Sequence, residues 1–335
     1  MKKFIKALLS SVVTLCCAIA FTAGIAGCTT RIGYKVYAPD GAPALSLYAL
    51  SGDNYSEFSV SAVNAETINV YVTGNNPQAD FAILPVNAAV KLLGDGEKYR
   101  MLGTVTHGNL FLLKKMNGEM IETTDDLSKL IGKTVGVINL ANVPGLTFKS
   151  ILADNEIEFN ELKEGVSVAD DKVNLKAVDK TEVLPSNADC DYFVAPEPAV
   201  STKVTATEGK LSVAGSLQTL YGGESGYPQA VAVVKNSLWQ SQAADKFVKA
   251  LEDARGLLLS ESVTAEDVVN AVSGWLVGDA KPTFTADNLS KTVIENCGIK
   301  FVAAQSCKQE VLAYMQKVNA QSNGNFGTPA DKFFG

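Results

Sequence analysis

Several short stretches of this sequence are apolar at almost every position, not only at every second one. Residues 81–84, 134–138 and 230–234 are examples. Such runs are typical of strands buried on both faces, as in a parallel sheet between two layers of helices. Segments suited to helices, at 86–93 and 144–155, lie between them. The sequence therefore predicts an α/β protein.

The alternation of strands and helices starts twice along the chain, which predicts two α/β lobes. Beyond residue 234 the chain is predicted to be mainly helical, because Phe247, Leu251, Ala254 and Leu258 repeat at helical spacing. The other predicted strands are 34–38, 67–72, 101–105, 110–113, 173–178, 192–195 and the short run 299–303, and the other predicted helices are 44–50 and 125–130.

Four of the predicted strand-to-helix turns carry a proline in or beside the first helical turn. They are Asp40-Gly41-Ala42-Pro43, Leu84-Pro85-Val86-Asn87, Asn142-Val143-Pro144-Gly145 and Pro196-Glu197-Pro198. Proline suits this place because its missing N–H would be unpaired there. In open parallel sheets such turns lie at the carboxyl ends of the strands, where ligands bind. Their distribution over both lobes favours a ligand cleft.

The N-terminus has the pattern of a secretory signal. Lys2, Lys3 and Lys6 precede an apolar stretch that ends in Ile25-Ala26-Gly27-Cys28. A membrane-spanning helix is the alternative, but glycines interrupt its end and no basic cluster follows. The last four residues resemble the lipobox of bacterial lipoproteins. We expect a signal peptide at 1–27 and a lipid anchor at Cys28, whose thiol would carry acyl chains such as palmitate.

Charge and cysteine content exclude several classes of function. Of the 29 basic residues, 26 remain after residues 1–27 are removed, against 36 acidic ones, a net charge of −10. This acidity argues against nucleic acid as a partner. One histidine and no Cys-x-x-Cys pair leave little support for a metal or redox site. Cys297 and Cys307 could form a disulfide or stay as two buried thiols.

Several segments together resemble one family, the ABC-transporter solute-binding proteins of the nitrate, sulfonate, taurine and thiamine-precursor group. The similar segments occur in order over residues 34–235, and none is specific alone. They are Pro39–Leu45, Ala79–Pro85, Gly108–Leu112, Gly132–Val137, Asp191–Pro198 and Tyr227–Ala230.

The resemblance implies the two-lobed type II periplasmic-binding-protein fold with a central ligand cleft. Lobe one would comprise 28–109 and 232–335, and lobe two 110–231. The implied function is capture of a small molecule outside the cell membrane and delivery to an ABC permease and its ATPase. We expect a monomer without cofactor, held at the extracytoplasmic face by Cys28. Thr29, which is not Asp, favours a host with a single membrane.

The polar side chains nearest the predicted cleft are the candidate ligand-binding residues, although each could instead be a turn residue. They are Asp40, Asn75, Asn76, Asn87, Asn109, Asn142 and Glu197, with Tyr227 as the aromatic member. Tyr48 and Phe111 are further aromatic candidates. His107, in the segment that joins the lobes, is expected to pack there and not to catalyse.

The four turns carry acid but no lysine or arginine, which bears on the ligand. Helix N-termini suit anions, yet nitrate or a sulfonate should require a basic partner. Asp40 and Glu197 instead favour an amine-bearing or pyrimidine-like ligand. Two alternatives stay open: a pyrimidine-synthase-like enzyme on the same fold, and a surface sensor lipoprotein without a transport role. The enzyme alternative has little support. Once the signal peptide is removed no adjacent cysteines remain, and the sequence has no Gly-x-Ser-x-Gly nucleophile elbow.

Overall fold

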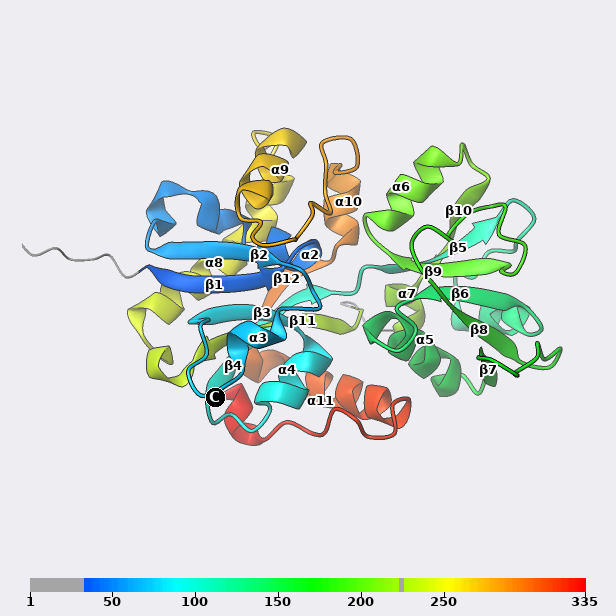
Figure 1. The fold of residues 1–335 in the computed structure, drawn as a ribbon, viewed down its shortest axis with the longest axis horizontal. Coiled ribbons are helices and arrows are strands. Elements are labelled where there is room, and N and C mark those ends of the chain that lie inside the picture. The colour runs from blue at the N-terminus through cyan, green and yellow to red at the C-terminus, as the bar shows by residue number, and fades with distance from the viewer. Residues whose placement is uncertain (1–32, 223–225) are drawn as a thin grey trace, which may run out of the picture. The chain divides into compact units, whose positions relative to one another are not determined.

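The computed structural model describes residues 33–222 and 226–335, and residues from Tyr34 onward form one compact unit (Figure 1). The predicted signal peptide at 1–27 and the predicted lipid site at Cys28 lie outside the described residues. No helix within the described ranges is long and apolar enough to cross a membrane. The predicted α/β class is confirmed, since two six-stranded sheets are each covered by helices.

The first sheet has the strand order β12-β4-β11-β3-β1-β2. Strand β1 runs parallel to β2 and β3, whereas β11 is antiparallel to β3 and β4, and β12 is antiparallel to β4. Its strands are β1 (Tyr34–Pro39), β2 (Phe58–Val63), β3 (Phe81–Pro85), β4 (Tyr99–His107), β11 (Pro228–Lys235) and β12 (Ile299–Ala303).

The second sheet has the order β10-β5-β9-β6-β8-β7, and only β5 runs against the others. Its strands are β5 (Leu110–Lys115), β6 (Thr134–Ile138), β7 (Phe159–Leu162), β8 (Val173–Val178), β9 (Tyr192–Pro196) and β10 (Leu211–Ser216). The chain passes from the first sheet to the second between β4 and β5 and returns through β11. All of β11 pairs within the first sheet, so the expected lobe boundary at 231/232 falls inside this strand.

Helices cover both faces of the first sheet because its central strands are apolar on both sides. Ala82 and Leu84 of β3 pack with α4 and α11, whereas Phe81 and Ile83 of the same strand pack with Phe247 of α8. Figure 1 shows α8 and α4 on opposite sides of β3. The helices that follow first-sheet strands are α2 (Ala42–Leu45), α3 (Asn69–Val72), α4 (Val86–Leu93), α8 (Gln242–Leu259), α9 (Ala265–Gly274), α10 (Lys291–Asn296) and α11 (Ala304–Ala320).

The second sheet is covered in the same way. Leu112 faces the cluster that includes Phe148 of α5, whereas Leu113 faces the cluster that includes Val200 of α6. The α-helices of this half are α5 (Val143–Asp154), α6 (Ala199–Ala206) and α7 (Leu217–Tyr221). Short 3-10 helices complete the fold at η1 (Tyr48–Ser51), η2 (Asp53–Tyr55), η3 (Thr124–Leu130), η4 (Asn236–Leu238) and η5 (Asp331–Phe334).

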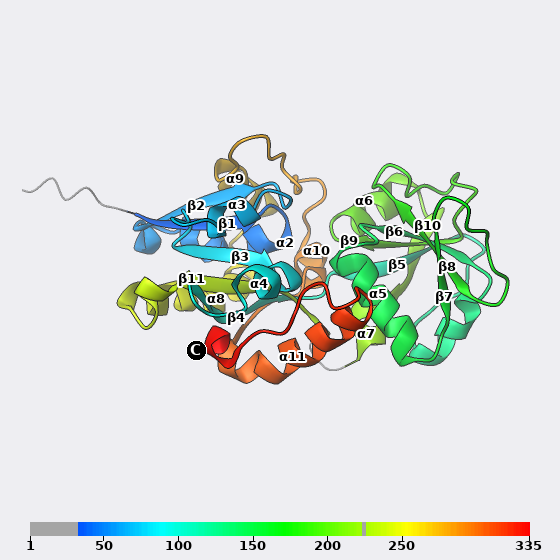
Figure 2. The ribbon, with the colours of Figure 1, turned by 60° about the horizontal axis from the view of Figure 1, so that its bottom comes forward.

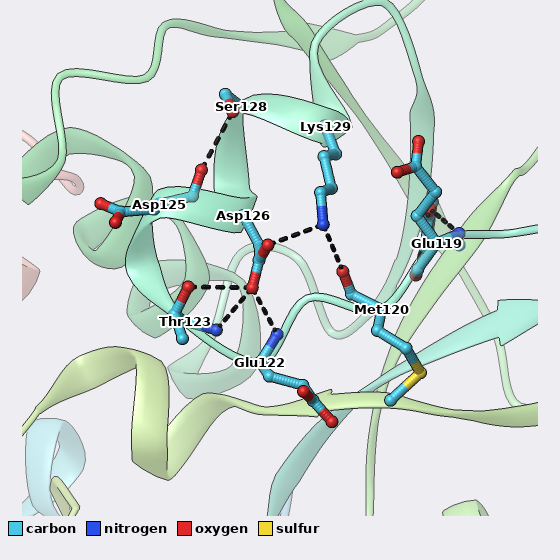
Figure 3. A network of polar contacts seen from close by, with 9 residues as sticks. Glu119, Met120, Glu122, Thr123, Asp125, Asp126, Ser128 and Lys129 are labelled. Atoms are coloured by element: carbon cyan, nitrogen blue, oxygen red, sulfur yellow. Dashed lines mark hydrogen bonds and ion pairs between the residues drawn. The ribbon is translucent and has the colours of Figure 1, made fainter.

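The helix predicted at 125–130 is a 3-10 helix whose first turn is fixed by one carboxylate. Asp126 Oδ2 accepts hydrogen bonds from the backbone N–H of Thr123 at 2.9 Å and of Glu122 at 3.1 Å, and its Oδ1 accepts from Lys129 Nζ at 2.7 Å (Figure 3). The hydrogen bond from Lys129, followed by those from Thr123, lowers the pKa of Asp126. This network closes the turn that leads into β6.

The strand predicted at 67–72 is wrong, and the neighbour of β1 is β2 at Phe58–Val63. Residues 69–72 form helix α3 instead. Ile68 and Val72 are buried one helical turn apart, while Val70 between them is 61% exposed. Strand β2 was not predicted because serines at 59 and 61 interrupt its apolar residues. It lies at the edge of the sheet, where a polar face is tolerated.

Two further outcomes concern helix limits and cysteines. The helix predicted at 44–50 is divided into α2 and η1. Cys297 and Cys307 are free and buried, as is Cys190, so of the two alternatives for the pair the structure has the buried thiols.

Candidate functional site

The two first-sheet turns that carry proline lie side by side at the carboxyl ends of adjacent parallel strands. The register pairs Val36 of β1 with Phe81 of β3. Asp40 follows β1 directly, and Asn87 lies in the first turn of α4 after β3. Strand β11 begins next to β3, with Ala230 opposite Pro85, so Gln229 reaches the same edge. Three polar side chains therefore gather at one sheet edge.

The corresponding edge of the second sheet carries the other two turns. Strands β6 and β9 are parallel neighbours, with Val137 opposite Val194. Asn142 precedes α5 after β6, and Glu197 follows β9. The side chain of Asn142 is exposed at this edge and makes no capping hydrogen bond to α5.

The chain crosses between the two sheets twice, once from β4 to β5 (the outgoing crossing) and once on its way into β11 (the returning crossing). Asn109, in the outgoing crossing, connects the two carboxyl edges. Its side-chain Oδ1 accepts a hydrogen bond from Gln229 Nε2 at 2.7 Å, and its backbone oxygen accepts from the Glu197 N–H at 3.0 Å. Asn109 is only 5% exposed. The structure thus brings the outgoing crossing, the returning crossing and the β9–α6 turn into direct contact.

Three side-chain oxygens at the first-sheet edge are buried without a hydrogen-bond partner in the described part of the chain. They are Asp40 Oδ1, Asn87 Oδ1 and Gln229 Oε1. Asp40 uses its other oxygen to accept from the Thr283 N–H at 2.6 Å. Buried polar atoms normally have partners, because desolvating them without one costs about 1–3 kcal/mol. These oxygens are hydrogen-bond acceptors, and they suit N–H or O–H donors.

Glu197 is buried, but its carboxylate is already bonded within the protein. Oε1 accepts from Ser201 Oγ at 2.8 Å and from Asn296 Nδ2 at 2.9 Å, and Oε2 accepts from the Ser201 N–H at 3.0 Å. The bonds to Ser201 cap the first turn of α6. Glu197 therefore holds protein groups together, which the sequence pattern did not indicate.

Asn75 and Asn76 are not brought to this site. Both are exposed in the loop before β3, and the neighbouring Gly74 oxygen accepts from Lys98 Nζ at 2.6 Å. Lys98 precedes β4, so this loop lies at the amino ends of the strands, the opposite edge from Asp40. The two residues were placed at the cleft because 67–72 was predicted as a strand, and that prediction is wrong.

The aromatic candidates pack inside the protein. Tyr227 is fully buried, and its ring stacks on Tyr314 with centroids 5.8 Å apart. Burial raises the pKa of Tyr227 well above its ordinary value. Phe111 belongs to the core on one face of the second sheet, and Tyr48 packs half-buried against the cluster around α9.

His107 ends β4 and is buried in the crossing. Its Nε2 lies 3.0 Å from Thr104 Oγ1, and its backbone N–H donates to the Gly298 oxygen at 2.8 Å. Burial, followed by the positive charge of Lys300, lowers its pKa to about 4. Both His107 and Thr104 are buried.

The low pKa of His107 predicts a pH-dependent stability. An unfolded histidine titrates near pH 6.5, so between pH 6.5 and 4 the unfolded chain binds more protons than the folded one. The free energy of unfolding is expected to fall by about 2–3 kcal/mol between pH 7 and pH 4.5 from this residue. Urea unfolding at both pH values measures the change. His107 is the sole histidine, and a His107→Gln variant that loses stability equally steeply would contradict the assignment.

Two residues that contribute to this region were not predicted from the sequence. Gln229 lies in the segment Tyr227–Ala230, which resembles the solute-binding proteins, but it was not predicted to be a site residue. Asn296 ends α10, and no sequence signal places it beside Glu197, because that contact joins positions 99 residues apart. Among the described residues, no group of three or more His, Cys, Asp or Glu side chains could hold a metal ion.

No protein-family model matches the sequence, and none of the curated proteins matches it either. Several solved structures of other proteins are similar to this chain. An ABC transporter protein from Parabacteroides distasonis is similar with a TM-score of 0.67 at 16% identity, over 90% of this chain and 98% of that one. The zinc-bound ligand-binding component of an ABC-type import system from Staphylococcus aureus has a TM-score of 0.55 at 12% identity, over 90% and 95%.

The alkanesulfonate-binding protein from Xanthomonas axonopodis pv. citri, bound to MOPS, has a TM-score of 0.51 at 12% identity, over 90% of this chain and 95% of that one. At these identities the likeness concerns the fold. The chain therefore has the two-lobed α/β fold of the periplasmic solute-binding proteins of ABC transporters.

Proposed function

We propose that this protein is the extracytoplasmic solute-binding component of an ABC importer. The observation that carries the proposal is the set of buried, unpartnered oxygens of Asp40, Asn87 and Gln229 at the carboxyl edge of the first sheet, within the described residues. This edge is where open α/β sheets bind ligands. The solved structures of similar fold include a ligand-binding component of an import system and an alkanesulfonate-binding protein.

The ligand we propose is a small polar organic molecule that bears N–H donors, such as an amine or an aminopyrimidine. The unpartnered atoms are acceptors, and one belongs to the carboxylate of Asp40. The four proline turns contain no lysine or arginine to neutralise nitrate or a sulfonate. Asp40, Asn87 and Gln229 are proposed to contact the ligand directly, and Asn109 to position Gln229 through their 2.7 Å hydrogen bond. Asn142 would contact it from the second lobe.

The lobes that enclose this ligand are proposed to be built around the two sheets. Lobe one would contain the first sheet with all of β11, and lobe two the second sheet. On this proposal the segments around Asn109 and Tyr227 are the crossings. Ligand binding would draw the two carboxyl edges together, as in hinge closure.

Retention near the permease is proposed to depend on lipid chains at Cys28, with the protein acting as a monomer at the outer face of the cell membrane. Labelled palmitate fed to cells is expected to be incorporated into the protein and to be lost in a Cys28→Ala variant. A Cys190→Ala variant should keep the label, because Cys190 is buried in the folded protein. Label retained by Cys28→Ala would exclude this anchor.

The transport role is tested by first identifying the solute and then following its uptake. Residues 29–335 purified without denaturation are expected to carry a small solute, whose mass identifies it after release by acid. Cells that lack the chain should take up this solute more slowly, and the intact chain should restore uptake. Normal uptake in cells lacking the chain would contradict the importer role and favour a sensor.

A further inference from the structure

The segment between α9 and α10, residues 277–290, contains no helix or strand, and it lies against the turn that carries Asp40. We call it the α9–α10 loop. Figures 1 and 2 show it, in gold and orange, passing near α2 on its way to α10. Loops of about 12–15 residues without secondary structure are uncommon in compact domains and are often functional. The contact of this loop with Asp40 therefore bears on the binding site.

Two apolar side chains pack the α9–α10 loop onto the β1–α2 turn. Phe284 and Leu289 are each 3% exposed and belong to the same buried cluster as Leu45 of α2. At the turn itself, Gly41 has a φ of +99°, and a Cβ there would lie 3.8 Å from Thr283 Cγ2. The loop is thus held directly beside Asp40.

The loop gives the two carboxylate oxygens of Asp40 different surroundings. Oδ2 accepts a hydrogen bond from the Thr283 N–H at 2.6 Å. Oδ1 is buried and has no hydrogen-bond partner among the described residues. Asp40 therefore offers Oδ1 to a ligand, whereas Oδ2 is already engaged by the protein.

Asn288 braces the part of the loop that reaches Asp40. Its Oδ1 accepts from the Thr285 N–H at 2.7 Å, and its Nδ2 donates to the Thr283 oxygen at 3.3 Å. Asn288 is half-buried and lines a cavity of about 520 Å³ between the loop and α6. Because a cavity lies on this side of the loop, the two bonds of Asn288, and not packing against α6, hold residues 283–285 in shape.

We propose that the α9–α10 loop makes the binding site selective for a primary ammonium group over a guanidinium group, and that Asn288 is a positioning residue for this selectivity. The inference rests on the proposed function and narrows the chemical class of its ligand. A guanidinium pairs most favourably with a carboxylate through two parallel N–H···O bonds, one to each oxygen. At Asp40 this pairing would compete with the Thr283 N–H for Oδ2.

The number of free acceptors at this sheet edge also favours the ammonium group. Among the described residues, Asp40, Asn87 and Gln229 contribute three unpartnered oxygens there, and an ammonium group has three N–H donors. A guanidinium has five N–H donors in a fixed plane. Some of these donors would be buried without an acceptor, which lowers the affinity.

Methylammonium and methylguanidinium test the proposal, because they carry the same charge and the same methyl group. NMR titration of residues 29–335, dialysed free of solute, measures both dissociation constants. Methylammonium is expected to bind at least about tenfold more tightly, since one hydrogen bond with a charged group corresponds to about this factor. Methylguanidinium binding equally or more tightly, or no binding of either probe, would overturn the proposal.

Asn288→Ala should remove the selectivity without removing the site. When its two bonds are lost, the Thr283 N–H is no longer held on Asp40 Oδ2, which becomes available to a second N–H of the ligand. The ratio of the two dissociation constants is expected to fall from about tenfold towards one. Thermal unfolding should change little, because Phe284 and Leu289 still anchor the loop.

Thr292→Ala serves as the comparison for Asn288→Ala. Thr292 is exposed and lines the same cavity, and its truncation should leave the ratio at the wild-type value. A purely structural role of Asn288 would weaken both probes equally, so an unchanged ratio in Asn288→Ala would overturn its role in selectivity. The importer role is judged separately by uptake, which distinguishes its failure from the failure of this inference.

Discussion

Asp40→Asn is expected to weaken ligand binding by about 10- to 100-fold while leaving the fold intact. Asp40 Oδ2 accepts from the Thr283 N–H, a bond that an asparagine oxygen can keep. The buried Oδ1 has no partner among the described residues, and the substitution replaces its negative charge. Hydrogen bonds that involve a charged group contribute about 1.5–3 kcal/mol, and each 1.4 kcal/mol is tenfold in affinity.

Asp287→Asn is the matched control for this prediction. Asp287 lines a cavity of about 520 Å³ between α6 and the segment that leads into α10, is exposed, and carries the same charge as Asp40. Calorimetric titration of the solute identified by mass should show near-normal affinity for Asp287→Asn. The reverse order, with Asp287→Asn weakened and Asp40→Asn normal, would place the ligand in the cavity beside α6 and exclude the proposed site.

Tyr314→Ala is expected to lower the free energy of unfolding by about 3–5 kcal/mol, the range for truncating a buried aromatic residue. Tyr314 is fully buried, stacks on Tyr227 and contacts Tyr221. Its removal would leave a cavity where α11 meets α5, between the cores of the two sheets. Equilibrium unfolding in urea at pH 7 measures the loss.

Tyr314→Phe separates the contribution of the ring from that of the hydroxyl group. This variant keeps the stack and loses only the bond to Thr147, so a loss of about 1 kcal/mol is expected.

A second consequence of removing the Tyr314 ring concerns the cooperativity of unfolding. If the shared core couples the two lobes, the wild type should unfold in one transition and Tyr314→Ala in two. A loss below about 1 kcal/mol in Tyr314→Ala would show that the packed rings of Tyr221, Tyr227 and Tyr314 do not join the lobes.

The central strands and several helices could be predicted from the sequence because their apolar pattern is local. Strands β6, β8 and β12 and helix α4 have the predicted limits. The apolar pattern did not predict β2, the outermost strand of the first sheet, and wrongly predicted a strand at 67–72. The β-branched run at 67–72 favours a strand by propensity, yet burial of Ile68 and Val72 makes it helical. Strand β7, with no fully buried residue, gave no signal either.

The candidate site was only partly predictable, since it depends on contacts between distant segments. Asp40 and Asn87 were placed at the sheet edge because each directly follows a strand that was predicted well. Asn75 and Asn76 were misplaced together with the false strand before them. The bond from Asn296 to Glu197 has no local pattern, so the contact of the Glu197 carboxylate with another protein segment could not be predicted.

Thermal unfolding of residues 29–335 against a panel of solutes tests the central claim most directly. The panel should contain protonated amines and aminopyrimidines on one side and alkanesulfonates and nitrate on the other. A bound ligand at 100 times its dissociation constant adds about 2.7 kcal/mol, which corresponds to a rise in Tm of about 5 °C for a chain of this size. The account predicts such a rise for a compound with N–H donors, and loss of the rise in Asp40→Asn. A rise with sulfonates or nitrate and none with the amines would contradict it.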